Sequence, residues 1–264
     1  MGEQDVGDLE VIRRGIEGWL ARAMPGREGL RIAQLDFPKS SGESSVTLIL
    51  DGRFADGGEE RFVLRMAPRE SQVFETHDLR MQFEMMQVMH AEKIPAPALV
   101  GYEPDASILG SDFYVMRFTE GRIPPDNPPM VFAGWVKELS ESERATMWRR
   151  GLETLAAIHR IDVRRHDLSR LPRAKPGESV VAHELRKFDS MFRPDLRAGA
   201  TPVLSEAWAL AREKAPGPGE ARLCWGDSRV GNVIWRDLAP VAVIDWEMAN
   251  LSDPLADLSW WIWI

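Results

Sequence analysis

Three oxygen-bearing side chains, Asp227, Asn232 and Asp245, lie in two short segments near the end of the sequence. Segment 225–232 reads WGDSRVGN, and segment 243–247 reads VIDWE. The glycines loosen the backbone of the first segment and no apolar periodicity crosses it, so the segment is predicted to be a loop.

Short apolar runs of strand type surround these side chains at 223–225, 233–235 and 241–244. Between the second and third runs lies RDLAP at 236–240, a plausible hairpin connection. A hairpin here would bring Asp245 back beside Asn232 and Asp227.

These residue types suit phosphoryl transfer. Mg²⁺ prefers hard oxygen ligands and keeps several waters, so Asp245 and Asn232, together with nucleotide phosphates, would be sufficient to hold it. A second carboxylate close to the metal can orient an incoming hydroxyl and accept its proton, and Asp227 fits that role.

The pattern of predicted elements changes near residue 118, and the chain is predicted to form two lobes that position this loop. Before residue 118, the patterns predict a small sheet with one long helix, the composition of a nucleotide-binding lobe over 1–118. The expected elements are an amphipathic helix at 8–24, strands at 30–35, 45–50 and 61–66, a Met-rich helix at 76–91, and strands at 98–102 and 112–118.

After Gly121 the pattern becomes helical, which predicts a catalytic lobe over 119–264. Ser140 or Ser142 is the expected N-cap of a helix that runs to Ile161. A polar loop at 163–180 and helices at 181–192 and 203–214 follow, and the run APGPG at 215–219 ends the last helix.

The spacing of Asp227, Asn232 and Asp245 resembles the catalytic loop of protein kinases. With DPLADL at 253–258, it more closely resembles the aminoglycoside phosphotransferase family of small-molecule kinases. The most similar branch is the kinase-like group found free-standing in actinobacteria and fused to acyl-CoA dehydrogenases. FYVM at 113–116, EGR at 120–122, PPDNPP at 124–129 and LAAIH at 155–159 extend the resemblance over nearly the whole chain.

The resemblance implies a two-lobed α/β (α+β) protein-kinase-like fold that binds ATP and Mg²⁺. It places Arg65 at the strand position of the phosphate-binding lysine, and Ser44, Met116 and Phe118 at the nucleotide. The polar run 39–45 that includes Ser44 could cover phosphates with backbone N–H groups or form an ordinary hairpin turn.

Four other residues bear on the expected active site: Gln82, Arg229, Glu247 and Asp257. Gln82 stands where relatives carry the acid that pairs with the strand cation, and Glu84 lies about 200° around the helix from it. Arg229 could neutralise phosphate charge or pair with a nearby acid, and Glu247 could reach a metal or a substrate cation or support the turn. The resemblance implies that Asp257 supports the catalytic loop through backbone hydrogen bonds.

Composition narrows the function classes. A net charge of -8 argues against a general nucleic-acid surface, and one cysteine with five scattered histidines gives neither a disulfide framework nor zinc spacing. No window approaches the roughly 20 apolar residues of a membrane span, and the acidic N-terminus is unlike a secretory signal. We expect a cytoplasmic protein without a membrane or nucleic-acid partner; its oligomeric state leaves no signal in the sequence.

The expected activity is transfer of the γ-phosphoryl group of ATP to a hydroxyl of a small molecule. An aminoglycoside acceptor would call for an acidic pocket and a hydroxyacyl-CoA for a basic one. The apolar run LSWWIWI at 258–264 looks like the start of a buried helix, so we expect a chain truncated within the catalytic lobe. The alternatives are a catalytically impaired nucleotide-binding or interaction module of the same fold and, more distantly, a metal-dependent hydrolase.

Overall fold

A computed structural model describes residues 9–27, 29–38, 45–67, 78–197, 202–215 and 219–263, with only the backbone described over 190–197. The chain divides into two compact units. The first contains residues 1–151 and 231–247, and the second contains 152–230 and 248–264. The expected lobe boundary near residue 118 stays a prediction.

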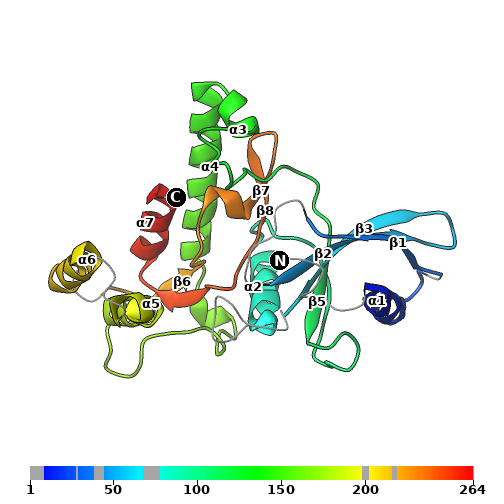
Figure 1. The fold of residues 1–264 in the computed structure, drawn as a ribbon, viewed down its shortest axis with the longest axis horizontal. Coiled ribbons are helices and arrows are strands. Elements are labelled where there is room, and N and C mark those ends of the chain that lie inside the picture. The colour runs from blue at the N-terminus through cyan, green and yellow to red at the C-terminus, as the bar shows by residue number, and fades with distance from the viewer. Residues whose placement is uncertain are drawn as a thin grey trace. The chain divides into compact units, whose positions relative to one another are not determined.

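The first unit is built on a five-stranded antiparallel sheet with the strand order β1-β2-β3-β5-β4 (Figure 1). Its strands are β1 (Arg31–Asp36), β2 (Val46–Arg53), β3 (Glu59–Met66), β4 (Leu99–Glu103) and β5 (Phe113–Arg117). All five were predicted from sequence, with ends displaced by one to three residues, because apolar and polar residues alternate along them.

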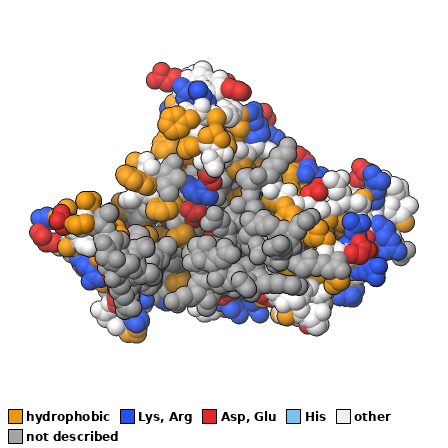
Figure 2. Space-filling model, viewed as in Figure 1, with side chains coloured by type: hydrophobic (Ala, Val, Ile, Leu, Met, Phe, Trp, Pro, Cys, Tyr) orange, Lys and Arg blue, Asp and Glu red, His pale blue; other side chains and the backbone are white. Residues whose placement is uncertain are grey.

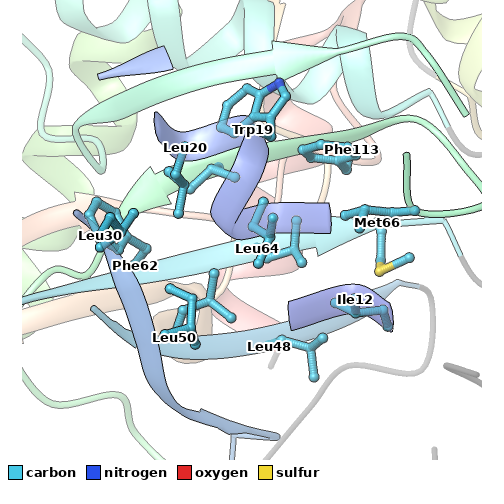
Figure 3. Close-up of a cluster of buried hydrophobic side chains, with 14 of the residues drawn as sticks. Ile12, Trp19, Leu20, Leu30, Leu48, Leu50, Phe62, Leu64, Met66 and Phe113 are labelled. Atoms are coloured by element: carbon cyan, nitrogen blue, oxygen red, sulfur yellow. The ribbon is translucent and has the colours of Figure 1, made fainter. Parts of the chain in front are cut away.

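Because apolar and polar residues alternate along β2 and β3, the two faces of the sheet differ in polarity. Leu48, Leu50, Phe62 and Leu64 point from β2 and β3 toward helix α1 (Leu9–Ala23) and are completely buried there. Figure 3 shows these side chains together with Trp19 of α1 and other members of the same core. The sheet and the amphipathic face of α1 thus close one core, and residues of odd number on β2 and β3 belong to the opposite face.

Helix α2 (Leu79–Ala91) contacts strands β4 and β5. It begins at Asp78, whose carboxylate accepts a hydrogen bond from the backbone N–H of Met81 at 2.8 Å. Met81, Met85 and Met89 are all buried, which confirms that this methionine stripe fills the core.

The expected hairpin is formed by β7 (Val233–Arg236) and β8 (Ala239–Val243), which pair antiparallel within the first unit. Its two turn residues, Asp237 and Leu238, have φ angles of 51° and 60°. Two consecutive residues with positive φ are typical of the tight turn whose twist matches that of paired strands.

A long helix, α4 (Glu141–His159), runs along the chain from the first unit into the second, after the short helix α3 (Trp135–Glu138). Ser140 caps α4: its hydroxyl accepts from the N–H of Glu143, and the Glu143 carboxylate accepts from the N–H of Ser140 at 2.7 Å. This reciprocal capping box selects Ser140 over Ser142 as the N-cap.

The second unit is mainly helical and contains one short antiparallel strand pair, β6 with β9. Its helices α5 and α6 confirm two predicted helices, although α5 extends five residues beyond the expected end at 192. The elements are η2 (Val163–Arg165), α5 (Val180–Arg197), α6 (Pro202–Glu213), β6 (Arg222–Cys224), β9 (Asn250–Ser252) and α7 (Pro254–Trp263), while η3 (Val230–Asn232) spans the junction between the units.

Acidic and basic side chains are interspersed on the described surface (Figure 2). Ion pairs such as Arg27 with Glu60 at 3.0 Å and Arg61 with Asp51 at 3.1 Å reflect this mixture. Within the described residues, none of the helices combines the length and the hydropathy that crossing a membrane would require.

Truncation of Leu64 tests the core between the sheet and α1. We expect Leu64→Ala to lower the free energy of unfolding by about 2–5 kcal/mol, because it removes buried methyl groups and leaves a cavity. Urea unfolding followed by circular dichroism would measure it. Val11→Ala, on the exposed side of α1, is the control and should change stability by less than about 0.5 kcal/mol; equal effects of the two substitutions would contradict the assigned core.

Candidate active site

The β7–β8 hairpin brings the two candidate metal ligands of the first unit to the same end of one ladder. Val233 pairs with Val243, and the N–H of Ile244 donates to the carbonyl oxygen of Asn232 at 3.0 Å. Asp245 follows directly, so the prediction that a hairpin returns it to Asn232 is confirmed. Their roles as ligands stay predictions.

Asp245 has a φ of 63° although it is not a glycine. Such a conformation is uncommon outside Gly, Asn and Asp, and is maintained only where the surroundings determine it. Its carboxylate oxygen lies 3.6 Å from the guanidinium of Arg65, and both side chains are largely buried. The turn therefore points a carboxylate toward the cation of the central strand.

Arg65 is held by neutral oxygen atoms as well as by this carboxylate. It donates to the hydroxyls of Thr47 and Ser45, each at 3.1 Å, and interacts electrostatically with Tyr114, which lies directly opposite it on β5. Burial lowers the pKa of Arg65, but interactions with Tyr114, Asp245 and Glu247 outweigh that effect and raise it. Arg65 is fully ionised at neutral pH.

The partner of Arg65 on helix α2 was left open between two residues. Gln82 accepts a hydrogen bond from the Tyr114 hydroxyl at 3.2 Å, and Glu84 pairs with Arg80 at 2.8 Å. Both helix residues thus engage other partners, while Arg65 pairs with Asp245.

Three further residues were expected at the nucleotide. Met116 lies on β5 opposite Val63, on the same face as Tyr114, and is partly buried. The ring of Phe118 lies 3.7 Å from the guanidinium carbon of Arg61. Ser44 lies outside the described residues. A role at the nucleotide remains a prediction for all three.

In the second unit, the candidate base Asp227 is held by two donors. Trp260 Nε1–H donates to one carboxylate oxygen at 2.7 Å, and Arg229 Nε–H donates to the other at 3.2 Å. Of the two roles considered for Arg229, pairing with an acid is the one observed here, and that acid is Asp227.

Trp260 was not singled out from the sequence. The signal that could have found it is its spacing: Trp260 lies three residues after Asp257 on α7, so the two side chains share a helix face. Once Asp257 is assigned to the catalytic loop, its neighbour on that face also becomes a candidate to contact the loop.

Asp257 organises the backbone around Asp227. Its carboxylate accepts hydrogen bonds from the N–H groups of Trp225 at 2.7 Å and Gly226 at 2.8 Å, and contacts His159 Nε2 at 2.9 Å. Its own carbonyl oxygen accepts from the Ser228 hydroxyl at 2.7 Å. The expectation that Asp257 supports this loop through backbone hydrogen bonds is confirmed.

Gly226 allows the loop to approach its neighbour. Its φ is 91°, and a Cβ atom at this position would lie 2.1 Å from the carbonyl oxygen of Met248. Any other residue would clash with backbone, so the glycine directly before Asp227 is required by packing as well as by its dihedral angle.

His159, Cys224 and Asp257 bring possible metal-ligating atoms within 4.8 Å of one another. Both carboxylate oxygens of Asp257, however, accept hydrogen bonds from the protein. Burial also raises the pKa of the Cys224 thiol, which disfavours the thiolate that binds metals. We therefore assign this cluster to support of the loop.

A pocket of about 370 Å³ adjoins the base within the second unit. Trp260 lines it and also donates to Asp227, and Gly226, Asp257, Phe188 and Trp263 contribute to its walls. On α7, Trp261 is buried whereas Ile262 and Trp263 are exposed. The run is helical over 258–263, but the helix begins at Pro254, before the run, and the exposure of Ile262 and Trp263 differs from the buried helix that was expected. Truncation stays a prediction.

The residues of the first unit fit a nucleotide with Mg²⁺. Asp245 and Asn232 supply the carboxylate and amide oxygens that Mg²⁺ prefers. Arg65 supplies a buried cation, and its Nε atom is buried without a hydrogen-bond partner among the described residues. A phosphate oxygen would satisfy this donor.

Known proteins resemble this chain in sequence and in fold. The model of the phosphotransferase enzyme family matches residues 40–264. Acyl-CoA dehydrogenase family member 11 of Gallus gallus is 29% identical over 251 residues, a match that covers 93% of this chain and 30% of that protein. The chain thus spans less than a third of the length of this relative.

Solved structures share the fold. The GDP complex of aminoglycoside 2'-phosphotransferase-IIIa superposes with a TM-score of 0.63 at 13% identity, covering 94% of this chain and 77% of that one. The ternary complex of streptomycin, ATP and APH(2")-IIa gives 0.57 at 18% identity, covering 95% and 75%. The expected kinase-like α/β fold is confirmed.

Replacement of Asp257 tests its support of the loop. We expect Asp257→Asn to lower the free energy of unfolding by about 3 kcal/mol, because an amide N–H₂ would face backbone donors in a buried site. Urea unfolding measures the change.

Asp253→Asn is the matched control. Asp253 precedes α7 and accepts from the N–H of Leu255 at 2.9 Å, a capping role that Asn fills equally well. A loss below about 1 kcal/mol is expected there. If Asp257→Asn were as mild as the control, the loop would not depend on this carboxylate.

Proposed function

Because this chain belongs to the phosphotransferase enzyme family, we propose that it transfers the γ-phosphoryl group of ATP, with Mg²⁺, to a hydroxyl group of a small molecule. The observation that carries the proposal is the conformation of Asp245. This carboxylate is held at positive φ at the end of the hairpin that begins after Asn232, within 3.6 Å of the buried Arg65.

Three residues of the first unit divide two tasks in this proposal. Asn232 and Asp245 hold Mg²⁺, which when bound neutralises charge on the phosphate oxygens. Arg65 binds a phosphate of the nucleotide through its fork of N–H donors. Because the cation is buried, its attraction for phosphate is screened less than it would be on the surface.

Asp227 acts on the acceptor. The acceptor oxygen forms a new bond to the γ-phosphorus, the bond from that phosphorus to the ADP oxygen breaks, and the hydroxyl proton moves to the Asp227 carboxylate. Trp260 and Arg229 hold the carboxylate in one orientation while it does so. Four residues separate Asp227 from Asn232, so the length of the loop limits how far the base can lie from the metal ligand.

We place the acceptor in the pocket beside Asp227. Its volume of about 370 Å³ suits a small molecule, and Trp260 connects its wall directly to the base. The aromatic side chains Phe188, Trp260 and Trp263 favour an acceptor with an apolar portion next to its reactive hydroxyl. From the sequence alone, we also propose that the protein resides in the cytoplasm.

Two substitutions separate the two tasks. We expect Asp245→Asn to abolish the Mg²⁺-dependent part of ATP binding, because it removes the carboxylate ligand. We expect Asp227→Asn to retain ATP affinity within about threefold and to lower the rate of ADP formation by about a hundredfold or more, because the base is lost. Calorimetry gives the affinities, and ADP release in the presence of hydroxylated acceptors gives the rate.

Asp237→Asn is the control for Asp245→Asn. It makes the same chemical change at a residue with positive φ in the same hairpin, but at an exposed turn. It should leave Mg²⁺-dependent binding unchanged. ATP binding without turnover in the unaltered protein would support a nucleotide-binding module, and turnover that survives Asp227→Asn would refute the assigned base.

A further inference from the structure

Arg65 lies in a cross-strand row with the residues that hold it. Thr47 on β2 is directly opposite Arg65, and Arg65 is directly opposite Tyr114 on β5. Directly opposed residues point to the same face of a sheet, so three neighbouring strands contribute one polar residue each. This face is the one opposite α1, whereas Phe113 and Val115 of β5 belong to the core against α1.

Tyr114 connects this row to helix α2. Its ring packs against Phe83 with the ring centroids 6.2 Å apart, and its hydroxyl donates to Gln82 Oε1 at 3.2 Å. Arg65, directly opposite Tyr114 on β3, interacts electrostatically with the same side chain. Because a phenol has one proton and Tyr114 donates it to Gln82, the phenol oxygen can act toward Arg65 only as an acceptor.

Both members of this connection are neutral and buried. Tyr114 is 3% exposed and Gln82 is 1% exposed. Burial raises the pKa of Tyr114 to about 12, with Asp245 and Glu247 adding to the effect, so the hydroxyl is protonated at neutral pH. The helix therefore orients Arg65 without contributing a negative charge through this contact.

The negative charges that act on Arg65 come from Asp245 and Glu247, on the segment after the hairpin. In the proposed function Asp245 is a ligand of Mg²⁺. When its carboxylate binds the metal, its electrostatic attraction for Arg65 becomes weaker. The contacts with Tyr114, Thr47 and Ser45 involve neutral groups, so a metal on Asp245 takes no charge from them. They can hold the guanidinium in place while its charge is directed to phosphate.

We propose that Tyr114 and Gln82 form a neutral positioning pair that holds the Arg65 guanidinium for a nucleotide phosphate. This inference rests on the proposed nucleotide-binding function. In place of a carboxylate on the helix, which would neutralise the cation, a hydroxyl fixed by an amide orients it and preserves its charge. Tyr114 acts through Arg65 and needs no contact with the nucleotide.

The test is the affinity of Tyr114→Phe for MgATP, measured by calorimetry on the full chain. The substitution keeps the ring against Phe83 and removes the hydroxyl. We expect the Kd for MgATP to rise about tenfold, as for loss of a hydrogen bond that supports a charged group, with the Kd for adenosine unchanged. The difference between the two ligands reports on phosphate recognition, which a general structural role would not alter selectively.

The chain offers a matched control because it has two tyrosines. Tyr102 on β4 also lies near Phe83, with ring centroids 6.0 Å apart, but its hydroxyl donates to Asp112 at 2.8 Å. Tyr102→Phe should leave both affinities unchanged. In an Arg65→Met background, Tyr114→Phe should have no further effect on MgATP affinity, because the group it positions is absent.

The outcomes separate this inference from the function on which it rests. Failure of the unaltered protein to bind MgATP would overturn the nucleotide function and the inference together. Binding by the unaltered protein with equal affinity in Tyr114→Phe would overturn only the inference. An equal loss of ATP and adenosine affinity, or a further loss in the Arg65→Met background, would also overturn it.

Discussion

The first unit is constrained by one cation, Arg65, buried in the third strand of its sheet. A buried charge must be hydrogen-bonded and balanced, since removing it from water costs several kcal/mol. Hydroxyls of Ser45 and Thr47 accept hydrogen bonds from Arg65, the phenol of Tyr114 lies directly opposite it, and Asp245 provides a carboxylate 3.6 Å away. The positive φ of Asp245 is thus understandable as the backbone conformation that brings this carboxylate to the cation.

The second unit contains a buried anion, Asp257. Asp257 sits at the start of α7 and receives backbone N–H groups from Trp225 and Gly226, whose positions determine where Asp227 begins. A carboxylate can accept several donors at once, so one side chain can fix a loop that has little regular structure. Trp260, three residues later on the helix, then contacts Asp227 itself. The geometry of the base therefore depends on α7 as well as on its own loop.

Sequence patterns predicted the elements whose periodicity extends over several residues. The five strands of the sheet, helix α2 and the β7–β8 hairpin were found because alternation or helical spacing repeats within each. Strand β9 was missed because three residues carry no period, and its partner β6 lies more than twenty residues away in the sequence. Helix α5 was ended too early because Pro194 interrupts its pattern, although the backbone remains helical to Arg197.

The site shows a similar division. Asp227, Asn232 and Asp245 could be selected because a five-residue spacing and a hairpin are local features, and family resemblance pointed to Asp257. The partners of Arg65 could not be selected this way, because they are joined by strand register and not by spacing. Gln82 looked like a departure that weakened an ion pair, yet with Tyr114 opposite Arg65 an amide is the better partner. Its carbonyl oxygen accepts the hydrogen bond of the phenol without adding charge, so the departure at 82 and the tyrosine at 114 have one physical explanation.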